Sequence, residues 1–351
     1  MPGALWIVIL IVVVCVVATV SRRLGVSAPL ALVVVGVGGA YLPFVPDVHL
    51  EPQVALVGFL APLLYAAAVR LSLTDIRANR RPILFLSVGF VVFCTLVVGA
   101  FAVWLVPAPF GWPAALALGA VVAPPDAVAA TSVGRKVGMP RRIVSVLEGE
   151  SLVNDGSALV ALGAASGAIA ASVSFGWVAG RFVVAVGAGV LVGLVVTTLV
   201  TLVRRHVDDP VLGTTISLLT PFTAYLLAEE VHGSGVLAVV VAGVLLSRSS
   251  PVDQSARTRL AEASNWRTVQ FVLENAVFLI IGLQTPYVVE QARQELPLHT
   301  VVWLCAALLV VTLLCRFVWV YAGVLALGVL GRPQGGGGWS WRDATVISWA
   351  G

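Results

Sequence analysis

Long apolar segments, separated by short polar stretches, fill this chain from one end to the other. Each segment runs for about twenty residues, enough for a helix to cross a hydrocarbon core of ~30 Å. Lipid offers the backbone no hydrogen bonds, so segments of this kind must be helical. We predict an all-α polytopic membrane protein with roughly eleven complete spans and the start of a twelfth. Their approximate limits are 4–20, 26–43, 53–71, 82–106, 112–134, 143–169, 175–203, 209–229, 234–250, 268–289, 299–330 and 341 onward.

Two connecting stretches stand out by length and composition. Residues 247–267 are polar, and we predict an amphipathic connector there on the cytoplasmic side. Residues 331–338 are rich in glycine and predict a flexible loop without chemistry of its own. The chain stops at Gly351, inside an apolar segment, where a helix would leave carbonyls unpaired in lipid. We therefore expect this chain to be a fragment of a longer protein.

Composition supports the membrane assignment, and the distribution of basic residues predicts the orientation of the chain in the membrane. Hydrophobic residues make up 59% of the chain and charged residues 11%, whereas soluble domains carry about 25% charged residues. The basic residues cluster in alternate loops, which predicts that those loops are cytoplasmic and that the N-terminus is outside the cell membrane. The net charge of +4 therefore belongs to cytoplasmic loops and not to a nucleic-acid surface. The arginines behind this prediction include Arg22, Arg23, Arg70, Arg77, Arg80, Arg81, Arg141, Arg142, Arg204, Arg205, Arg248, Arg257, Arg259, Arg267, Arg332 and Arg342.

The sequence gives no support to catalysis or to ATP-driven transport. There is no Walker A motif, no HExxH, no nucleophile elbow and no repeat resembling a selectivity filter. The cysteines all lie in apolar segments without a CxxC pair, which predicts buried structural thiols and no metal or other cofactor. They are Cys15, Cys94, Cys305 and Cys315.

The fifth apolar segment contains two consecutive prolines followed by a carboxylate, Pro124-Pro125-Asp126. Prolines remove amide donors and disfavour helical geometry in the preceding residue, so we predict that the helix breaks here. Transporters use discontinuous helices so that freed carbonyls face an ion near the midplane of the membrane. The alternative is a simple proline kink.

The sixth segment carries the sequence EGESLVNDG, with two carboxylates at membrane depth. On a helix Ser151 and Asp155 share a face, and Glu150 and Asn154 form a neighbouring pair. Asp155 lies roughly 20 Å along the helix from Arg142, well inside the membrane. An ionised Asp costs about 2.5–3.5 kcal/mol there, which indicates a function in proton or cation transfer. The alternative is a polar contact between helices.

Two further charged residues lie inside apolar segments. Arg316 lies near the middle of the eleventh segment, where a guanidinium must be paired or face water. We predict Glu150 as its partner; the alternative is extension of the side chain to the membrane surface. Glu274, near the cytoplasmic end of its segment, lines an entrance for ions or has a structural role, and the sequence does not decide between the two.

These motifs resemble the bacterial and archaeal sodium/proton antiporters of the cation–proton antiporter 1 family. The most specific match is Glu148–Gly156, which is similar to the signature of that family's sixth span. Pro125-Asp126-Ala127 occupies the place where the family usually has Thr-Asp-Pro. The resemblance extends over nearly the whole chain and also includes Tyr225–Glu229, Ser234–Ala238, Glu274–Gly282 and Arg316.

The resemblance implies an inverted-repeat fold of thirteen helices, some of them discontinuous helices that cross. This chain would end within about the twelfth of these helices. It implies a cation- and proton-binding site with sodium at Asp155 and Asp126, Asn154 as the partner of Asp155, and Ser151 and Pro125 as candidate ligands. Glu150 and Arg316 would be a structural ion pair. The implied organisation is a homodimer with dimerisation-side helices in 1–81, a first core repeat in 82–170, linker and interface helices in 171–298, and the start of a second core repeat in 299–351.

The sequence departs from the family pattern in three ways. Pro125 replaces a threonine, which removes a hydroxyl but keeps a backbone carbonyl that can coordinate an ion. Ala66 stands where many relatives have a glutamate. The chain also ends before the second broken helix would be complete, so we expect the ion site to lack part of its scaffold.

The function we predict is exchange of cytoplasmic sodium for external protons, in which both ions compete for Asp155. The resemblance implies that this exchange is electroneutral, because family members with Asn-Asp at the positions of Asn154 and Asp155 generally exchange one sodium for one proton. Lithium or potassium in place of sodium remains an alternative, because selectivity depends on sub-ångström geometry. The rival classes are a channel-like or sensor protein on the same scaffold, and a carrier of organic anions. The latter would need a basic pocket, for which only Arg316 is available.

Overall fold

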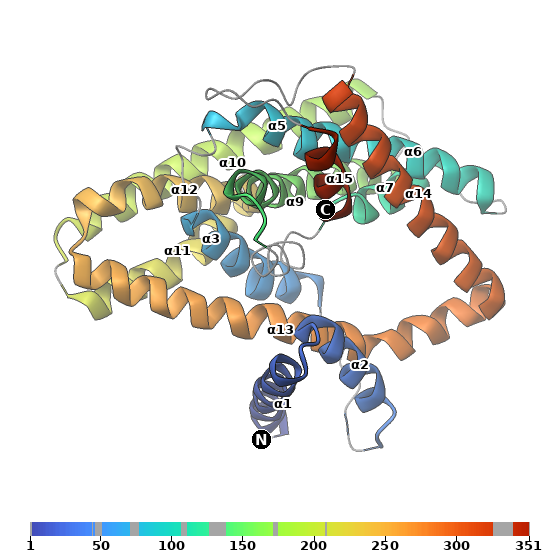
Figure 1. Cartoon of the computed structure of the whole chain (residues 1–351). Helices are drawn as coiled ribbons and strands as arrows, with labels where there is room; N and C mark the ends of the chain where they lie inside the picture. The colour runs from blue at the N-terminus through green and yellow to red at the C-terminus, as the bar shows by residue number, and fades with distance from the viewer. Residues whose placement is uncertain are drawn as a thin grey trace. The chain divides into compact units, whose positions relative to one another are not determined.

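The computed structural model describes residues 2–43, 45, 51–70, 77–106, 111–125, 138–170, 175–207, 209–325 and 340–350, and this described part contains helices and no strand. The predicted all-helical class is therefore confirmed (Figure 1). The elements are α1 (Pro2–Leu24), α2 (Ala28–Ala40), η1 (Val54–Leu60), α3 (Ala61–Arg70), α5 (Arg80–Leu84), η2 (Phe85–Gly89), α6 (Phe90–Leu105), α7 (Trp112–Val122), α9 (Arg141–Ala170), α10 (Phe175–Arg204), α11 (Pro210–Glu230), α12 (Gly235–Asp253), α13 (Ala256–Glu295), α14 (Leu298–Leu325) and α15 (Trp341–Ala350).

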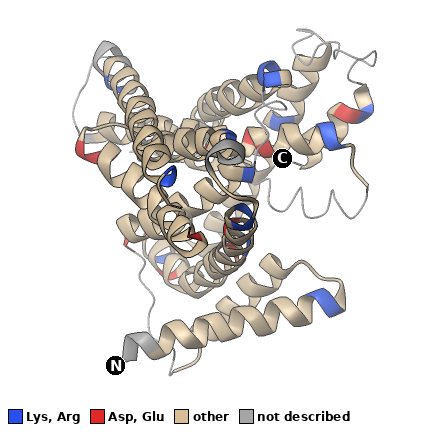
Figure 2. Cartoon of the chain, turned by 90° about the vertical axis from the view of Figure 1, so that its left-hand side faces the viewer, with Lys and Arg blue, Asp and Glu red and all other residues tan. Residues whose placement is uncertain are grey.

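Length and composition make the described helices suitable for a membrane. Seven of them are at least 18 residues long and apolar enough to cross it, and four shorter apolar helices of 10–17 residues accompany them. Figure 2 shows that blue and red segments, which mark the charged residues, are sparse along the ribbon. Most boundaries lie within a few residues of the predicted spans, because these spans end where polar or helix-breaking residues begin; α13, which starts well before its predicted span, is the main difference.

The polar stretch 247–267 differs from the separate connector that the sequence suggested. α12 continues to Asp253, and α13 begins at Ala256 and runs without interruption into the next span. The Ser255 hydroxyl accepts a hydrogen bond from the Thr258 amide at 3.2 Å and so caps the first turn of α13. Side chains of this stretch also find partners outside it: the Trp266 indole N–H, for example, donates to the Ser217 hydroxyl at 3.0 Å.

The chain forms two compact units. The first contains Met1–Ala66, Val200–Phe222 and Ser250–Val302; the second contains Ala67–Leu199, Thr223–Ser249 and Trp303–Gly351. Each unit therefore draws on parts of the chain that are far apart in sequence.

In the first unit α2 packs closely along α13, and glycines at the crossing make this approach possible. A Cβ atom on Gly36 would lie 2.5 Å from the Leu279 carbonyl oxygen and 2.9 Å from the Gly282 Cα. Both obstacles are backbone atoms, which cannot rotate away. Small residues let membrane helices approach to van der Waals contact, and this packing replaces the hydrophobic effect as their source of stability.

We therefore expect Gly36→Ala to destabilise the protein by about 1–3 kcal/mol, the usual cost of overpacking. Gly38→Ala is the matched control, because a Cβ at Gly38 in the same helix meets nothing within 4 Å. The measurement is thermal unfolding of the purified protein in detergent. Equal unfolding temperatures for the two variants would contradict the close crossing.

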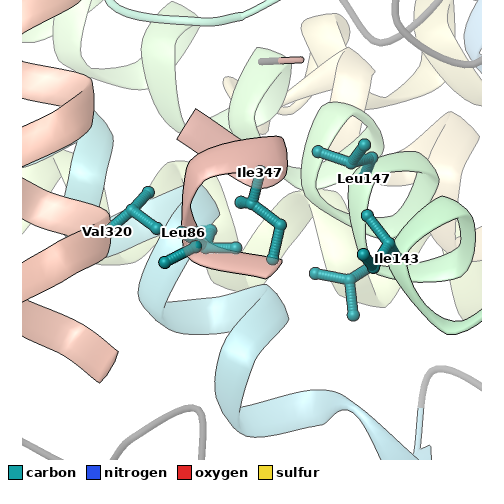
Figure 3. Packing of buried hydrophobic residues seen from close by; sticks show 7 residues of the cluster. Leu86, Ile143, Leu147, Val320 and Ile347 are labelled. Atoms are coloured by element: carbon teal, nitrogen blue, oxygen red, sulfur yellow. The ribbon is translucent and has the colours of Figure 1, made fainter. Parts of the chain in front are cut away.

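In the second unit the core joins η2, α9, α14 and α15. Leu86, Ile143, Leu147, Val320 and Ile347 meet in one buried apolar cluster (Figure 3). These side chains come from segments more than 250 residues apart, so the cluster fixes α15 against the first two turns of α9. It lies one turn from Glu150, and it thereby holds the polar part of α9 in place.

Candidate ion site

The prolines of the fifth segment end a helix, as the sequence predicts. α7 stops at Val122, and the Ala123 amide donates the last helical hydrogen bond to Gly119 at 3.0 Å. Pro124 and Pro125 have no amide hydrogen to continue the ladder. Asp126, the next predicted ligand, lies outside the described residues.

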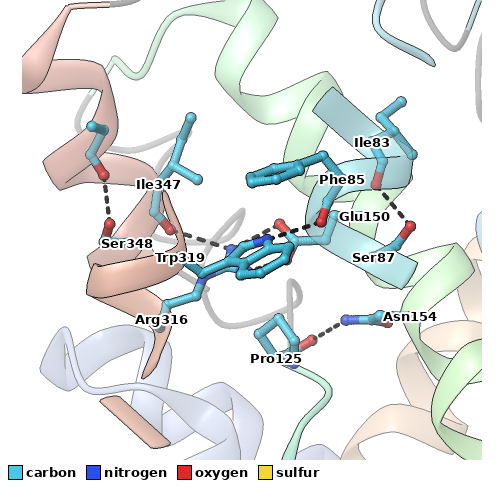
Figure 4. A network of polar contacts seen from close by, with 11 residues as sticks. Ile83, Phe85, Ser87, Pro125, Glu150, Asn154, Arg316, Trp319, Ile347 and Ser348 are labelled. Carbon is cyan, nitrogen blue, oxygen red and sulfur yellow. Dashed lines mark hydrogen bonds and ion pairs between the residues drawn. The ribbon is translucent and has the colours of Figure 1, made fainter. Parts of the chain in front are cut away.

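The Pro125 carbonyl meets Asn154 of α9. The Asn154 side-chain amide donates a hydrogen bond to the Pro125 carbonyl oxygen at 3.1 Å (Figure 4). Asn154 is completely buried, and its Oδ1 has no hydrogen-bond partner among the described residues. A buried acceptor without a donor costs about 1–3 kcal/mol. The amide thus ties α9 to the broken segment and leaves one carbonyl oxygen available for a cation.

Asp155 follows Asn154 in the middle of α9. It is 14 residues from the first residue of the helix, Arg141, or about 21 Å along the axis. Its side chain and that of Ser151, one turn earlier on the same face, are both half-buried. Carboxylate, hydroxyl and amide oxygens are the donor types that hard cations such as sodium prefer. The described residues contain no cluster of His, Cys, Asp and Glu that could hold a metal by those side chains alone.

Glu150 forms a buried ion pair with Arg316 of α14. Both Nη atoms donate to the carboxylate, and Arg316 Nη2 lies 2.8 Å from Glu150 Oε2 (Figure 4). The side chains are only 3% and 1% exposed. A planar guanidinium matches a carboxylate in this two-bond geometry, which offsets the cost of burying both charges.

The sequence did not indicate two further contacts of Arg316. Its Nη2 also lies 3.4 Å from the Ile347 carbonyl oxygen in α15, and its guanidinium lies 4.9 Å from the centroid of the Phe90 ring. Neither partner carries a sequence signal, because a backbone carbonyl and a phenylalanine in an apolar helix look ordinary. Arg316 thus connects α14 to α9, α6 and α15.

A neighbouring contact holds α14 to the π-helical turn η2. The Trp319 indole N–H donates to the Phe85 carbonyl at 3.0 Å, and the two rings stack with centroids 4.6 Å apart (Figure 4). A π-helical turn shifts the hydrogen-bond ladder by one residue, so a carbonyl near it can accept from a side chain.

Glu274 belongs to the first compact unit and the other described site residues to the second. It is half-buried on α13 and accepts a hydrogen bond from Gln270, one turn earlier.

The prediction of four buried cysteines is wrong for Cys15 and Cys305, which are exposed, whereas Cys94 and Cys315 are buried. An apolar segment does not reveal from its sequence which face meets lipid and which meets protein.

In this all-helical membrane protein a carboxylate-bearing helix contacts the prolines that follow the end of another helix, an arrangement that secondary transporters use at their ion sites. The model of the transmembrane sodium/hydrogen exchanger family matches residues 9–351, so the chain belongs to this family. The family resemblance seen in the sequence is thereby confirmed, and the family is one of transporters and not of enzymes.

Relatives and a solved structure agree with this assignment. An uncharacterised Na+/H+ exchanger of Mycobacterium tuberculosis is 36% identical over 361 residues, covering 99% of this chain and 64% of its own length. A sodium, potassium, lithium and rubidium/H+ antiporter of Bacillus pumilus is 34% identical over 307 residues, covering 84% of this chain and 45% of its own length. The sodium proton antiporter MjNhaP1 of Methanocaldococcus jannaschii superposes with a TM-score of 0.76 at 16% identity, over 99% of this chain and 84% of that structure. The antiporter fold is thus shared, and the chain spans about two thirds of the mycobacterial relative.

Proposed function

We propose that this chain carries the ion site of a monovalent cation/proton antiporter that exchanges sodium for protons at Asp155. The observation that carries the proposal is the Oδ1 of the buried Asn154, which has no hydrogen-bond partner among the described residues. The hydrogen bond from the Asn154 amide to the Pro125 carbonyl holds this oxygen beside Asp155. An acceptor oxygen without a donor, next to a carboxylate at membrane depth, suits a bare cation better than any neutral ligand.

Competition for one carboxylate explains the coupling in this proposal. Asp155 holds either a proton or a cation, and the neutral Asn154 adds no charge to either state. Exchange of one sodium for one proton then moves no net charge, so transport is electroneutral. Asp126, Ser151 and the Pro125 carbonyl complete the proposed ligand set. Sodium is the proposed cation; the name of the Bacillus pumilus relative includes potassium and lithium, which makes these the first alternatives to test.

Further parts of the proposal concern organisation and direction. The segments assigned to the two core repeats, 82–170 and most of 299–351, fall into the same compact unit, as a core that moves as one body requires. A homodimer and an external N-terminus follow from the family resemblance and from the distribution of arginines.

The experiment is a sodium-driven pH change in proteoliposomes, with the voltage clamped by valinomycin and potassium. One arm uses this chain, and a second uses the chain continued by the C-terminal remainder of the mycobacterial relative. We expect saturable proton movement that requires sodium on one side and does not depend on voltage. Sodium flux without a counter-moving proton would instead indicate a channel-like protein, and no flux in either arm would contradict antiport.

A further inference from the structure

The C-terminal end of α1 forms a basic surface together with α13. The last turn of α1 carries Arg22 and Arg23, and both are exposed. The Arg22 guanidinium lies over the Phe271 ring of α13, 5.4 Å from its centroid. The two helices also share an apolar cluster that includes Val14 and Leu279. The packing of the helices therefore fixes the position of Arg22 on α13.

This contact, taken together with the end of the apolar span of α1, indicates where a membrane surface would cross α13. At 1.5 Å per residue the 40 residues of α13 extend about 60 Å, twice the thickness of a hydrocarbon core, so length alone does not locate the surface. α1 does locate it, because its apolar span ends at Leu24. Phe271 therefore lies at the level of the headgroups, and the exposed Arg267 lies one turn before it on the same face of α13.

Three arginines, Arg22, Arg23 and Arg267, define this basic surface, and the part of the chain that the structure describes places no balancing charge beside them. No described carboxylate pairs with any of the three. The Arg267 Nε donates to the Ala263 carbonyl of its own helix at 3.2 Å, which leaves its terminal nitrogens for another acceptor. Figure 2 shows the basic end of the first helix as a blue segment, at the end far from the N-terminus.

The carboxylates of α13 near this level already have partners. Glu262 Oε1 lies 3.1 Å from Arg204 Nη2 and accepts from the Gln254 amide at 2.9 Å. Glu274 accepts from Gln270. Among the described residues, these pairings leave no carboxylate of α13 at this level to offset the positive charge of the basic surface.

We propose that the basic surface binds the phosphate headgroup of an anionic phospholipid. The guanidinium group presents a planar pair of donors that matches phosphate oxygens, and arginine is more weakly hydrated than lysine. Leu24, beside the arginines, is 71% exposed, and Val26 is 51% exposed. These side chains offer apolar contact to the lipid's chains, which a free phosphate ion cannot use.

The test is thermal unfolding of the purified chain in detergent, titrated with short-chain phosphatidylglycerol. Phosphatidylcholine and inorganic phosphate serve as the zwitterionic and lipid-free arms. We expect phosphatidylglycerol alone to raise the unfolding temperature. In R22Q/R267Q the concentration that gives half of this rise should increase about 25-fold, since each arginine near a membrane surface contributes about fivefold in binding.

The control is R293Q/R342Q, which removes the same charge from exposed positions elsewhere and should keep the wild-type response. An unchanged titration in R22Q/R267Q would overturn the proposal. So would an equal rise with phosphatidylcholine, or with inorganic phosphate. If R22Q/R267Q does not fold, R267Q alone carries the comparison, because the described hydrogen bond of Arg267 is confined to its own helix.

Discussion

We expect the Asp155→Asn substitution to abolish cation/proton exchange while the protein stays folded and inserted in the membrane. Asparagine has nearly the same shape as aspartate but takes up no proton and carries no charge. The site would then lose its ability to bind the proton and its ability to bind the cation at the same time. The neighbouring Asn154 hydrogen bond to Pro125 does not involve the Asp155 side chain and should persist.

The measurement is sodium-driven pH change in proteoliposomes, with thermal unfolding as the test of folding. Asp209→Asn is the matched control. Asp209 is exposed and accepts from the Val211 amide at 3.2 Å at the start of α11, a capping contact that asparagine can keep. Exchange by the Asp155→Asn protein at a rate close to wild type would show that the ion site lies elsewhere.

Breaking the Glu150–Arg316 pair has the largest expected effect on stability. Glu150→Gln leaves a guanidinium that is 3% exposed without its counter-charge, and Arg316→Met leaves a carboxylate that is 1% exposed. Removing one partner of a buried pair typically costs 3–5 kcal/mol, so we expect each single variant to lose about that much. Arg316 also contacts Ile347 and Phe90, so the loss should loosen the attachment of α15 and α6 as well.

The double variant Glu150→Leu/Arg316→Met separates charge from packing. It leaves neither charge buried, so we expect it to be more stable than either single variant. The exposed pair of Glu290 and Arg293, 3.9 Å apart, supplies the control, because Glu290→Gln should change stability by less than about 1 kcal/mol. Thermal unfolding in detergent measures all four proteins. A double variant no more stable than the singles would mean that the two side chains matter through their packing and not through their charges.

Most of the fold could be predicted from the sequence, because in a membrane the local hydrophobic pattern largely determines the backbone conformation. A segment of about twenty apolar residues in lipid has one low-energy backbone conformation, so the spans and the helix end before Pro124 follow from composition and proline alone. The need of Arg316 for a partner follows in the same way, since a charge at membrane depth cannot remain unpaired. The choice of Glu150 was a prediction from residue type, and the tertiary structure places the two side chains together.

Only the tertiary structure decided which faces meet. The sequence does not reveal that Gly36 lies against Gly282, that Phe90 covers Arg316, or that Arg22 lies on Phe271. In a helix that is apolar on every side, the hydrophobic pattern no longer distinguishes the buried face from the face toward lipid. The exposed Cys15 and Cys305 illustrate this limit. The sequence by itself thus determined the membrane spans and the residues with costly charges, whereas close packing between distant segments decided their neighbours.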